Sequence, residues 1–445
     1  MATGTKVYPP LSLEPTTRRE RWAWYLYDFG NSAYASVVLL AVYSAYFKQA
    51  VVGGARGSFL WGLSVGIAML VVAIISPVLG SIADFSAAKK RFLLGFTLMS
   101  VIFTALLFFA EPGHVLVGML FFILAEIGYR SAQVFYNGLL PEIATQEEIG
   151  RVSGIGWAIG TMGGILILLI ILPLIQGAEG TLMVRLSFVI TAAFYLLFSL
   201  PIFLWLKERA RPQDLPEGKN HLDIGLFRVF KTLREIKEQQ GHREFLKFVL
   251  AFLIYNDGVI MALDFAAIIG AVLFGMDQEA LIIFVILVQI ANVAGAYLFG
   301  YLTDRWGAKR ALLLSLGVML AAVVWMVFAQ SQTVFYIVGL LAGLGMAGVQ
   351  SISRTMVGML APPGESAEFY GFFAVAGRTS SFIGPTIYGW VAAAAAGWYA
   401  AHGWAPLAAE QIGQRWAIGS IGLFLLVGTV LLLFVRAGEK REAAA

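Results

Sequence analysis

The sequence contains no cysteine, and only 13% of its residues are charged. The first absence excludes disulfides and thiolate-bound metals. The second is unusual, because soluble domains carry about 25% charged residues. The four histidines form no His-Glu-x-x-His pair, and no Gly-x-x-x-x-Gly-Lys-[Ser/Thr] loop is present, so a zinc protease and an ATP-driven machine are not indicated. We therefore expect no cofactor, no metal site and no enzymatic activity.

Apolar residues make up 59% of the 445 residues, and the mean hydropathy is +0.80. Because a soluble core of this length could not hide so much apolar surface, membrane lipid is the expected partner. The net charge of +4 is too small to indicate a nucleic-acid partner. The first 21 residues are polar, and the apolar run that follows is longer than the core of a signal peptide. This run is therefore interpreted as the first membrane span.

Windows of roughly 20 apolar residues, the length that a helix needs to cross a bilayer, occur twelve times. We predict an all-α polytopic membrane protein with twelve transmembrane helices. The predicted spans are 22–47, 58–83, 92–110, 114–140, 152–176, 183–206, 245–274, 280–302, 311–329, 333–360, 368–395 and 415–436.

The placement of lysine and arginine predicts the topology. With the N-terminus inside, 24 of these residues fall on the cytoplasmic side and 4 on the outer side, while Arg130, Arg354 and Arg378 lie within spans. This bias obeys the positive-inside rule and places both termini in the cytoplasm.

A loop signature occurs twice between apolar segments. Gly80 and Asp84 of the first copy lie 220 residues before Gly300 and Asp304 of the second. The chain is thus predicted to consist of two related six-helix halves that rock about a midplane site, as in many transporters. The predicted domains are a tail (1–21), an N-terminal half (22–206), a linker (207–243), a C-terminal half (244–436) and a second tail (437–445). The linker contains either an interfacial amphipathic helix or a solvated helix that only joins the halves.

Charged residues inside spans are costly and mark functional sites by default. All of them except Arg378 fall on the first, fourth, seventh and tenth spans, which we expect to line a central water-filled cavity. Three asparagines lie beside them. The candidate cavity residues are Asp28, Asn31, Glu126, Arg130, Asn137, Asn256, Asp257, Asp264, Arg354 and Arg378.

The spacing of these residues predicts shared helix faces. Glu126 lies four residues before Arg130, and Asp257 lies seven before Asp264. Charges of both signs suit a zwitterion or a polar solute, and arginine is the better carboxylate clamp. Structural alternatives remain open: Glu126 and Arg130 could neutralise each other, and Arg378 could serve packing. Asp28, Arg354 and Asp264 could belong to gates.

The second copy of the signature, Gly300-Tyr301-Leu302-Thr303-Asp304-Arg305-Trp306-Gly307-Ala308-Lys309-Arg310, resembles the cytoplasmic motif of the major facilitator superfamily, Gly-x-Leu-x-Asp-Arg-x-Gly-x-Lys-Arg. The first copy departs from it at Ile82, Phe85, Ala87 and Lys90. Because that copy lacks the motif arginine, we expect Asp84 to depend on basic partners outside its own loop. The resemblance implies a major facilitator fold and a cytoplasmic gate formed by Gly80, Asp84, Gly300, Asp304, Arg305, Gly307 and Arg310.

Three further segments resemble the bacterial unknown-major-facilitator family, whose fungal relative is a vacuolar amino-acid effluxer linked to autophagy. They are Tyr27-Asp28-Phe29-Gly30-Asn31-Ser32-Ala33-Tyr34, Phe135-Tyr136-Asn137-Gly138-Leu139-Leu140-Pro141-Glu142-Ile143-Ala144 and Tyr255-Asn256-Asp257-Gly258. Phe29 and Gly30 depart from the Trp-Ala of the expected pattern. The resemblance implies amino-acid efflux across a bacterial plasma membrane.

We predict a monomeric secondary transporter that moves a small polar or zwitterionic solute by alternating access. An amino acid is the first candidate, and proton coupling is a hypothesis that rests on the excess of buried acids. Two alternatives remain: a non-transporting membrane receptor or scaffold that uses the 207–243 segment, and an exporter of lipids or amphiphiles.

Overall fold

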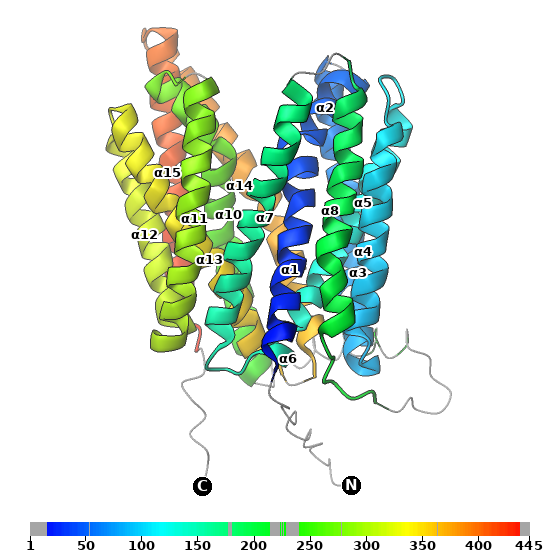
Figure 1. The fold of residues 1–445 in the computed structure, drawn as a ribbon. Helices are drawn as coiled ribbons and strands as arrows, with labels where there is room; N and C mark the ends of the chain where they lie inside the picture. The colour runs from blue at the N-terminus through cyan, green and yellow to red at the C-terminus, as the bar shows by residue number, and fades with distance from the viewer. Residues whose placement is uncertain are drawn as a thin grey trace. The chain divides into compact units, whose positions relative to one another are not determined.

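The computed structural model describes residues 16–52, 54–176, 180–213, 223, 225, 227, 240–276, 278–362 and 364–436. Helices dominate these residues, and no strand occurs among them (Figure 1). Residues 1–15 of the predicted N-terminal tail, the C-terminal tail, and most of the predicted linker with its amphipathic helix lie outside the described residues. The last residues of the predicted N-terminal tail are not a tail, because α1 begins at Arg18. The long helices are α1 (Arg18–Tyr34), α3 (Gly54–Ser86), α4 (Lys89–Leu106), α5 (Val115–Gly138), α7 (Ile149–Gln176), α8 (Leu182–Trp205), α10 (Gln240–Phe274), α11 (Gln278–Trp306), α12 (Ala308–Phe328), α13 (Gln332–Leu360), α14 (Ser366–Ala401) and α15 (Pro406–Leu433).

Eleven described helices are long and apolar enough to cross a membrane. The first of them continues α1 through a π-helical stretch (Ala35–Ala41), the short α2 (Tyr43–Tyr46) and a second π-helical stretch (Phe47–Val52). Helix α14 has 36 residues and completes a set of twelve long helices. The prediction of an all-α membrane protein with twelve spans is therefore confirmed.

The described chain divides into two compact units, and both use the same packing scheme. In unit 1, α1 packs on α8, α5 packs on α3 and α4, and α4 also contacts α8. In unit 2, α10 packs on α15, α13 packs on α11 and α12, and α12 also contacts α15. The helices correspond in chain order, as expected for a parallel repeat of one six-helix arrangement.

The units do not follow the chain order strictly. Unit 1 contains Met1–Gln146 and Ile159–Glu235 together with Ala361–Phe372, which includes the beginning of α14. Unit 2 contains Ile236–Leu360 and Phe373–Ala445 together with Glu147–Ala158, which includes the beginning of α7. Each unit thus holds the first turns of a helix from the other part of the sequence.

The repeated signature is mostly helical, so the prediction of a loop there was wrong. Gly80 to Asp84 lie in the last turns of α3, and Gly300 to Trp306 end α11. The turn itself is only a few residues long and uses positive φ at Ala87 (49°) and at Gly307 (87°). The signature therefore places its aspartates on helix ends, where a side chain is held more firmly than on a loop.

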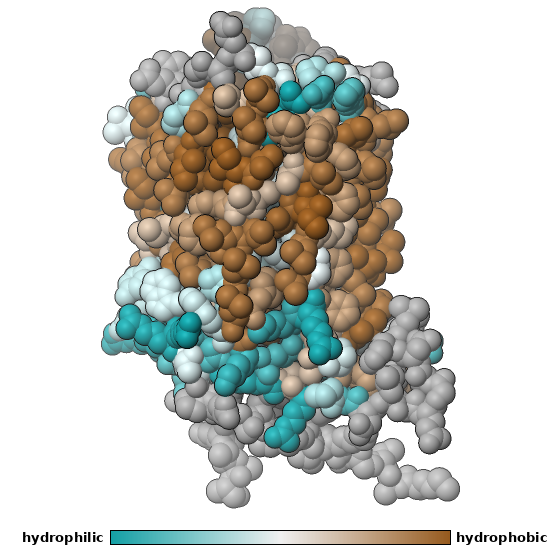
Figure 2. Space-filling model, turned by 45° about the vertical axis from the view of Figure 1, so that its right-hand side comes forward, coloured by the Kyte–Doolittle hydropathy of each residue, from teal (hydrophilic) through white to brown (hydrophobic). Residues whose placement is uncertain are grey.

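The surface matches a membrane protein. Figure 2 shows hydrophobic side chains over the middle of the visible face, a large group of hydrophilic side chains toward its lower end and a smaller group at its upper end. Large apolar side chains such as Leu204, Leu116 and Phe328 are exposed. This apolar surface is the part that lipid would cover.

Candidate functional site

In unit 1, α5 carries a buried ion pair. Arg130 Nε donates to Glu126 Oε1 at 2.6 Å, across one helical turn as the spacing predicts. The guanidinium lies 5.1 Å from the ring centroid of Tyr129, which stacks on Tyr34 of α1 at 4.7 Å. The glutamate is fully buried, whereas part of the arginine remains accessible. The contact is the mutual neutralisation that the sequence left open as the structural alternative.

Asp28 and Asn31 lie on α1, and both are buried. The Asp28 carboxyl carbon lies 3.0 Å from where a Cβ on Gly160 of α7 would stand. The Nδ2 atom of Asn31 is buried and has no hydrogen-bond partner in the described part of the chain. An amide donor in this state is available to a solute or to water.

Asn137 lies at the end of α5. Its Oδ1 atom is buried, and no partner for it occurs among the described residues. The next residue, Gly138, accepts a hydrogen bond from Ser366 Oγ at 2.7 Å. Asn137 thus adjoins the place where the beginning of α14 packs in unit 1.

In unit 2, Asp257 of α10 is 1% exposed. Its Oδ1 accepts a hydrogen bond from the Gly384 backbone N–H of α14 at 2.9 Å. A Cβ on Gly384 would stand 2.9 Å from the same oxygen, so glycine permits this close approach. The other oxygen, Oδ2, is buried without a hydrogen-bond partner among the described residues. Oδ1 is therefore hydrogen-bonded to the backbone of α14, and Oδ2 has no described partner.

The residues beside Asp257 connect α10 to α13. Asn256 Oδ1 accepts from Gln350 Nε2 at 3.1 Å. The Tyr255 hydroxyl lies 2.8 Å from Ser353 Oγ. These two bonds fix the register of α10 against α13, and with it the position of Asp257.

Arg354 of α13 binds the beginning of α7 within unit 2. Its Nε donates to Ser153 Oγ at 3.0 Å, and its Nη2 donates to the Ser153 carbonyl at 2.5 Å. The guanidinium also lies 5.9 Å from the Trp157 ring centroid. This contact favours the gate alternative for Arg354 over direct solute binding.

The two remaining cavity candidates are less informative. Asp264 is exposed in the second half of α10. The backbone of Arg378 lies in α14, but its side chain is outside the described part of the structure. Neither residue is placed beside the Glu126 or Asp257 clusters by a described contact.

The first copy of the signature forms a buried cluster. Lys89 Nζ lies 2.9 Å from Asp84 Oδ1 and 2.8 Å from Glu142 Oε1. Asp84 Oδ2 accepts the Glu368 backbone N–H at 2.9 Å, so it caps the beginning of α14. The expectation that Asp84 needs a base outside its own loop was wrong, because Lys89 follows three residues after the helix end. Asp84 is placed on the positive end of a helix dipole.

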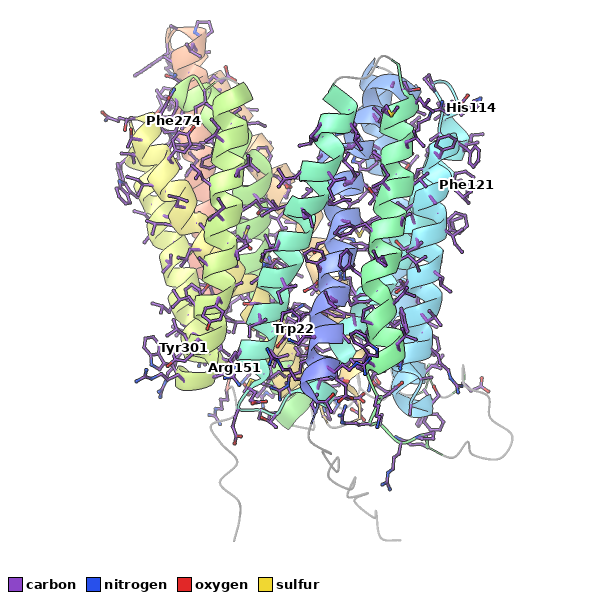
Figure 3. The ribbon with its side chains drawn as sticks, viewed as in Figure 1. Trp22, His114, Phe121, Arg151, Phe274 and Tyr301 are labelled. Atoms are coloured by element: carbon purple, nitrogen blue, oxygen red, sulfur yellow. The ribbon has the colours of Figure 1, made fainter. Side chains whose placement is uncertain are left out.

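The second copy makes the equivalent contact in unit 2. Asp304 Oδ1 accepts the Arg151 backbone N–H at 3.0 Å at the beginning of α7, and the Arg151 Nε lies 3.9 Å from Oδ2. Figure 3 shows Arg151 and Tyr301 at the same end of unit 2, with Phe274 at the opposite end. Arg305 and Arg310 are exposed, and the described side-chain contact of Arg305 is with Tyr301 in its own helix.

Both glycines that open the signature permit close helix approach. A Cβ on Gly80 would stand 2.4 Å from the Ala367 carbonyl oxygen of α14, and one on Gly300 would stand 3.1 Å from the Gly150 carbonyl oxygen. The paired aspartates reach helix termini because the backbones can approach at these two positions.

The segment after α8 is attached to the same cluster in unit 1. Glu208 accepts the backbone N–H groups of Lys89 at 2.8 Å and Lys90 at 3.2 Å, and Glu142 Oε2 accepts that of Arg209 at 2.6 Å. Burial raises the pKa of the Glu208 carboxyl above its ordinary value, the nearby Glu142 carboxylate adds to this rise, and Lys89 opposes it. The start of the predicted linker is thus held by carboxylates.

Several partners were not among the sequence candidates. Lys89, Arg151 and Ser153 contact the signature aspartates or Arg354, and Glu142 contacts Lys89. Lys89 stands at the lysine position of the first signature copy and Glu142 lies in another segment whose resemblance was noted, but neither was chosen as a site residue. The contacts with backbone amides at helix beginnings carry no side-chain signal in the sequence.

Solved structures share this fold. The human organic anion transporter MFSD10 matches 96% of this chain and 100% of its own with a TM-score of 0.70 at 13% identity. A bacterial homologue of the iron transporter ferroportin matches 94% of this chain and 99% of its own with a TM-score of 0.69 at 12% identity. The chain therefore has the fold of the major facilitator transporters and is a multi-pass membrane protein.

Sequence comparison defines the family. The profile described as "Vacuole effluxer Atg22 like" matches residues 55–397, and the chain belongs to this family of transporters. The uncharacterized MFS-type transporter YxiO of Bacillus subtilis is 28% identical over 432 residues, which cover 94% of this chain and 95% of YxiO. Autophagy-related protein 22 of Coccidioides immitis is 23% identical over 73% of this chain and 66% of its own length. The match to autophagy-related protein 22-2 of Aspergillus clavatus covers 45% of that protein's length.

Proposed function

We propose that the chain is a secondary active transporter that exports a small zwitterionic solute by alternating access, with an amino acid as the first candidate and protons as the coupling ion. The family description as a vacuole effluxer supports the direction. The substrate class is supported by the Asp257 carboxylate, whose Oδ2 has no described hydrogen-bond partner. The ammonium group of an amino acid would complement this carboxylate.

The observation that carries the proposal is the state of Asp257. Its Oδ2 is buried inside a membrane helix with no described hydrogen-bond partner, while Oδ1 is anchored on the Gly384 N–H. An isolated carboxylate in a low-dielectric region is strongly unfavourable, so it calls for a proton, a cation or an ammonium group. A transport cycle supplies such a partner in turn.

The solute class is tested first by thermal shift. The purified chain is heated with amino acids, dipeptides, sugars or phospholipid headgroups, because a ligand that binds only the folded state raises the melting temperature. We expect stabilisation by amino acids. Stabilisation by lipids alone would favour the exporter of amphiphiles, and no stabilisation by any class would favour the receptor or scaffold.

Transport is tested in proteoliposomes with an imposed pH gradient. Asp257→Asn keeps an acceptor for the Gly384 N–H, so we expect an unchanged melting temperature. The variant loses the charge, so we expect transport to fall roughly tenfold or more, which is the loss of affinity expected when one hydrogen bond to a charged group is removed. The matched control is Glu410→Gln, which removes an exposed carboxylate at the beginning of α15. Equal transport by Asp257→Asn and wild type would remove Asp257 from the site. Transport that ignores the pH gradient would refute proton coupling.

A further inference from the structure

A small cavity in unit 1 lies where α1 begins and α8 ends. Its volume is about 230 Å³, and it lies apart from the Glu126 cluster used in the proposed function. The lining combines three cationic side chains, one carboxylate and two apolar side chains. The lining residues are Thr17, Arg19, Glu20, Leu204, Trp205, Lys207 and Arg209.

The carboxylate in this lining is fully engaged in holding the cavity together. Glu20 Oε2 accepts hydrogen bonds from Thr17 N at 2.9 Å and from Arg209 Nη2 at 3.1 Å, while Oε1 accepts the Lys207 N–H at 3.1 Å. Thr17 Oγ1 in turn accepts the Glu20 N–H, which completes a capping box at the start of α1. Glu20 therefore joins α1 to the segment after α8, and its charge is offset by Arg209.

One donor nitrogen of Arg209 has no described partner. Its side chain is only 9% exposed, Nη1 donates to the Lys207 carbonyl and Nη2 to Glu20. Its Nε, however, is buried with no hydrogen-bond partner in the described part of the chain. A buried donor without an acceptor is costly, and a guanidinium N–H forms its strongest bonds with carboxylate or phosphate oxygens.

The other wall of the cavity is formed by Leu204 and Trp205. Arg19 lies over the Trp205 ring, with its Cζ 4.3 Å from the centroid. The neighbouring Leu204 is 72% exposed on a membrane-spanning helix. Tryptophan beside basic residues at a helix end is typical of the headgroup level of a bilayer.

We propose that this cavity binds a phosphate group, presented by the headgroup of an anionic phospholipid. Arg209, Arg19 and Lys207 supply the positive lining, and Leu204 and Trp205 lie beside the glycerol and acyl chains. Basic pockets at the cytoplasmic ends of membrane helices recognise anionic headgroups in this way. Free inorganic phosphate shares the recognised chemistry, so the experiment separates the two sources.

The test is native mass spectrometry of the full chain in detergent with phosphatidylglycerol, with diacylglycerol as the lipid that lacks phosphate, and with inorganic phosphate. The variant is Arg19→Gln with Lys207→Gln, which leaves the Glu20–Arg209 contact in place. The matched control is Arg91→Gln with Arg211→Gln, which removes two exposed cations outside the cavity. Each basic residue contributes about fivefold to anionic lipid binding, so we expect about thirtyfold weaker phosphatidylglycerol binding by the variant and little change in the control.

The proposal would be overturned if the variant bound both phosphatidylglycerol and inorganic phosphate as well as wild type does. It would also be overturned if the control lost as much phosphatidylglycerol binding as the variant, because the loss would then report overall surface charge. Binding of diacylglycerol as strong as that of phosphatidylglycerol would overturn it as well. Inorganic phosphate that binds wild type but not the variant, with lipid binding unchanged, supports the phosphate site and assigns it to free phosphate. If the double variant does not fold, Lys207→Gln is compared with Arg211→Gln. Amino-acid transport is a separate readout, so failure here leaves the proposed function standing.

Discussion

At the residue scale, the turn after each signature aspartate has a backbone conformation that suits glycine. The first copy has alanine there, at φ 49°, and the second has Gly307 at φ 87° and ψ 148°. A left-handed conformation costs an L-residue roughly 1–2 kcal/mol, and the region occupied by Gly307 is essentially restricted to glycine. The two positions are 220 residues apart and form a natural matched pair.

We therefore expect Ala87→Gly to raise the stability of the protein by about 1 kcal/mol or less, since glycine also increases the entropy of the unfolded chain. The reverse change, Gly307→Ala, should lower stability by about 1–3 kcal/mol. Melting temperatures in detergent measure both. Shifts of the same sign in the two variants would contradict the strain argument.

Glu208 predicts a dependence of stability on pH. Its pKa is raised in the folded protein by burial and by the Glu142 carboxylate. A raised carboxyl pKa means that the folded state binds the proton more tightly than the unfolded state. The stabilisation is therefore complete below the ordinary pKa of 4.5 and is lost as the pH rises through the higher folded value.

Glu208→Gln resembles the protonated form at every pH. The melting temperature of this variant relative to wild type should rise as the pH increases above 4.5 and then level off beyond the folded pKa. A pH series of melting curves measures this difference, with Glu410→Gln, at an exposed site, as the surface control. A difference that falls with increasing pH would contradict the assigned direction.

At the scale of elements, two helices begin on an acidic side chain from elsewhere in the sequence. Asp84 accepts the Glu368 N–H at the start of α14, and Asp304 accepts the Arg151 N–H at the start of α7. Loss of a capping acceptor costs about 0.5–2 kcal/mol, and loss of the charge adds about 0.3–1 kcal/mol from the helix dipole. The two contacts are equivalent in the repeated packing scheme.

Asp84→Ala and Asp304→Ala should each increase hydrogen exchange in the first turn of the helix that the aspartate caps. Asp84→Asn and Asp304→Asn should recover part of the protection, because asparagine keeps the acceptor but not the charge. Hydrogen–deuterium exchange of peptides that begin at α14 and α7 measures the effect. The control is Asp264→Ala, an exposed aspartate within α10. Unchanged exchange in both alanine variants would show that the caps do not hold the helix beginnings.

The same elements show what the sequence alone could predict. The twelve spans follow from hydropathy, since apolar length is a property of the chain itself. The Glu126–Arg130 pair follows from helical spacing, and the burial of Asp257 was expected from its place in a span. The helix-capping bonds of Asp84 and Asp304 and the Ser153 contact of Arg354 did not follow, because their partners are backbone groups or a serine brought close by tertiary packing. The 207–243 helix remains a prediction outside the described residues.

At the scale of the whole molecule, the two units use one helix-packing scheme, and the chain has no native cysteine. The first fact supports a parallel duplication, in which corresponding loops lie on the same side of the membrane. The second makes topology measurable, because every introduced cysteine is labelled against no background. The bias of 24 cytoplasmic to 4 outer basic residues predicts which side each loop occupies.

Position 211 follows α8 and is predicted to lie in the cytoplasm, whereas positions 114 and 402 are predicted to lie outside. The native side chains Arg211, His114 and His402 are exposed, so each is replaced by cysteine in turn. In intact cells, a membrane-impermeant maleimide should label the His114→Cys and His402→Cys variants but not the Arg211→Cys variant. After the membrane is made permeable, all three variants should be labelled, which serves as the accessibility control. The opposite labelling pattern would show that the predicted orientation is reversed. Labelling of only one of the two outer sites in intact cells would contradict the parallel duplication, because these sites lie in different halves of the sequence.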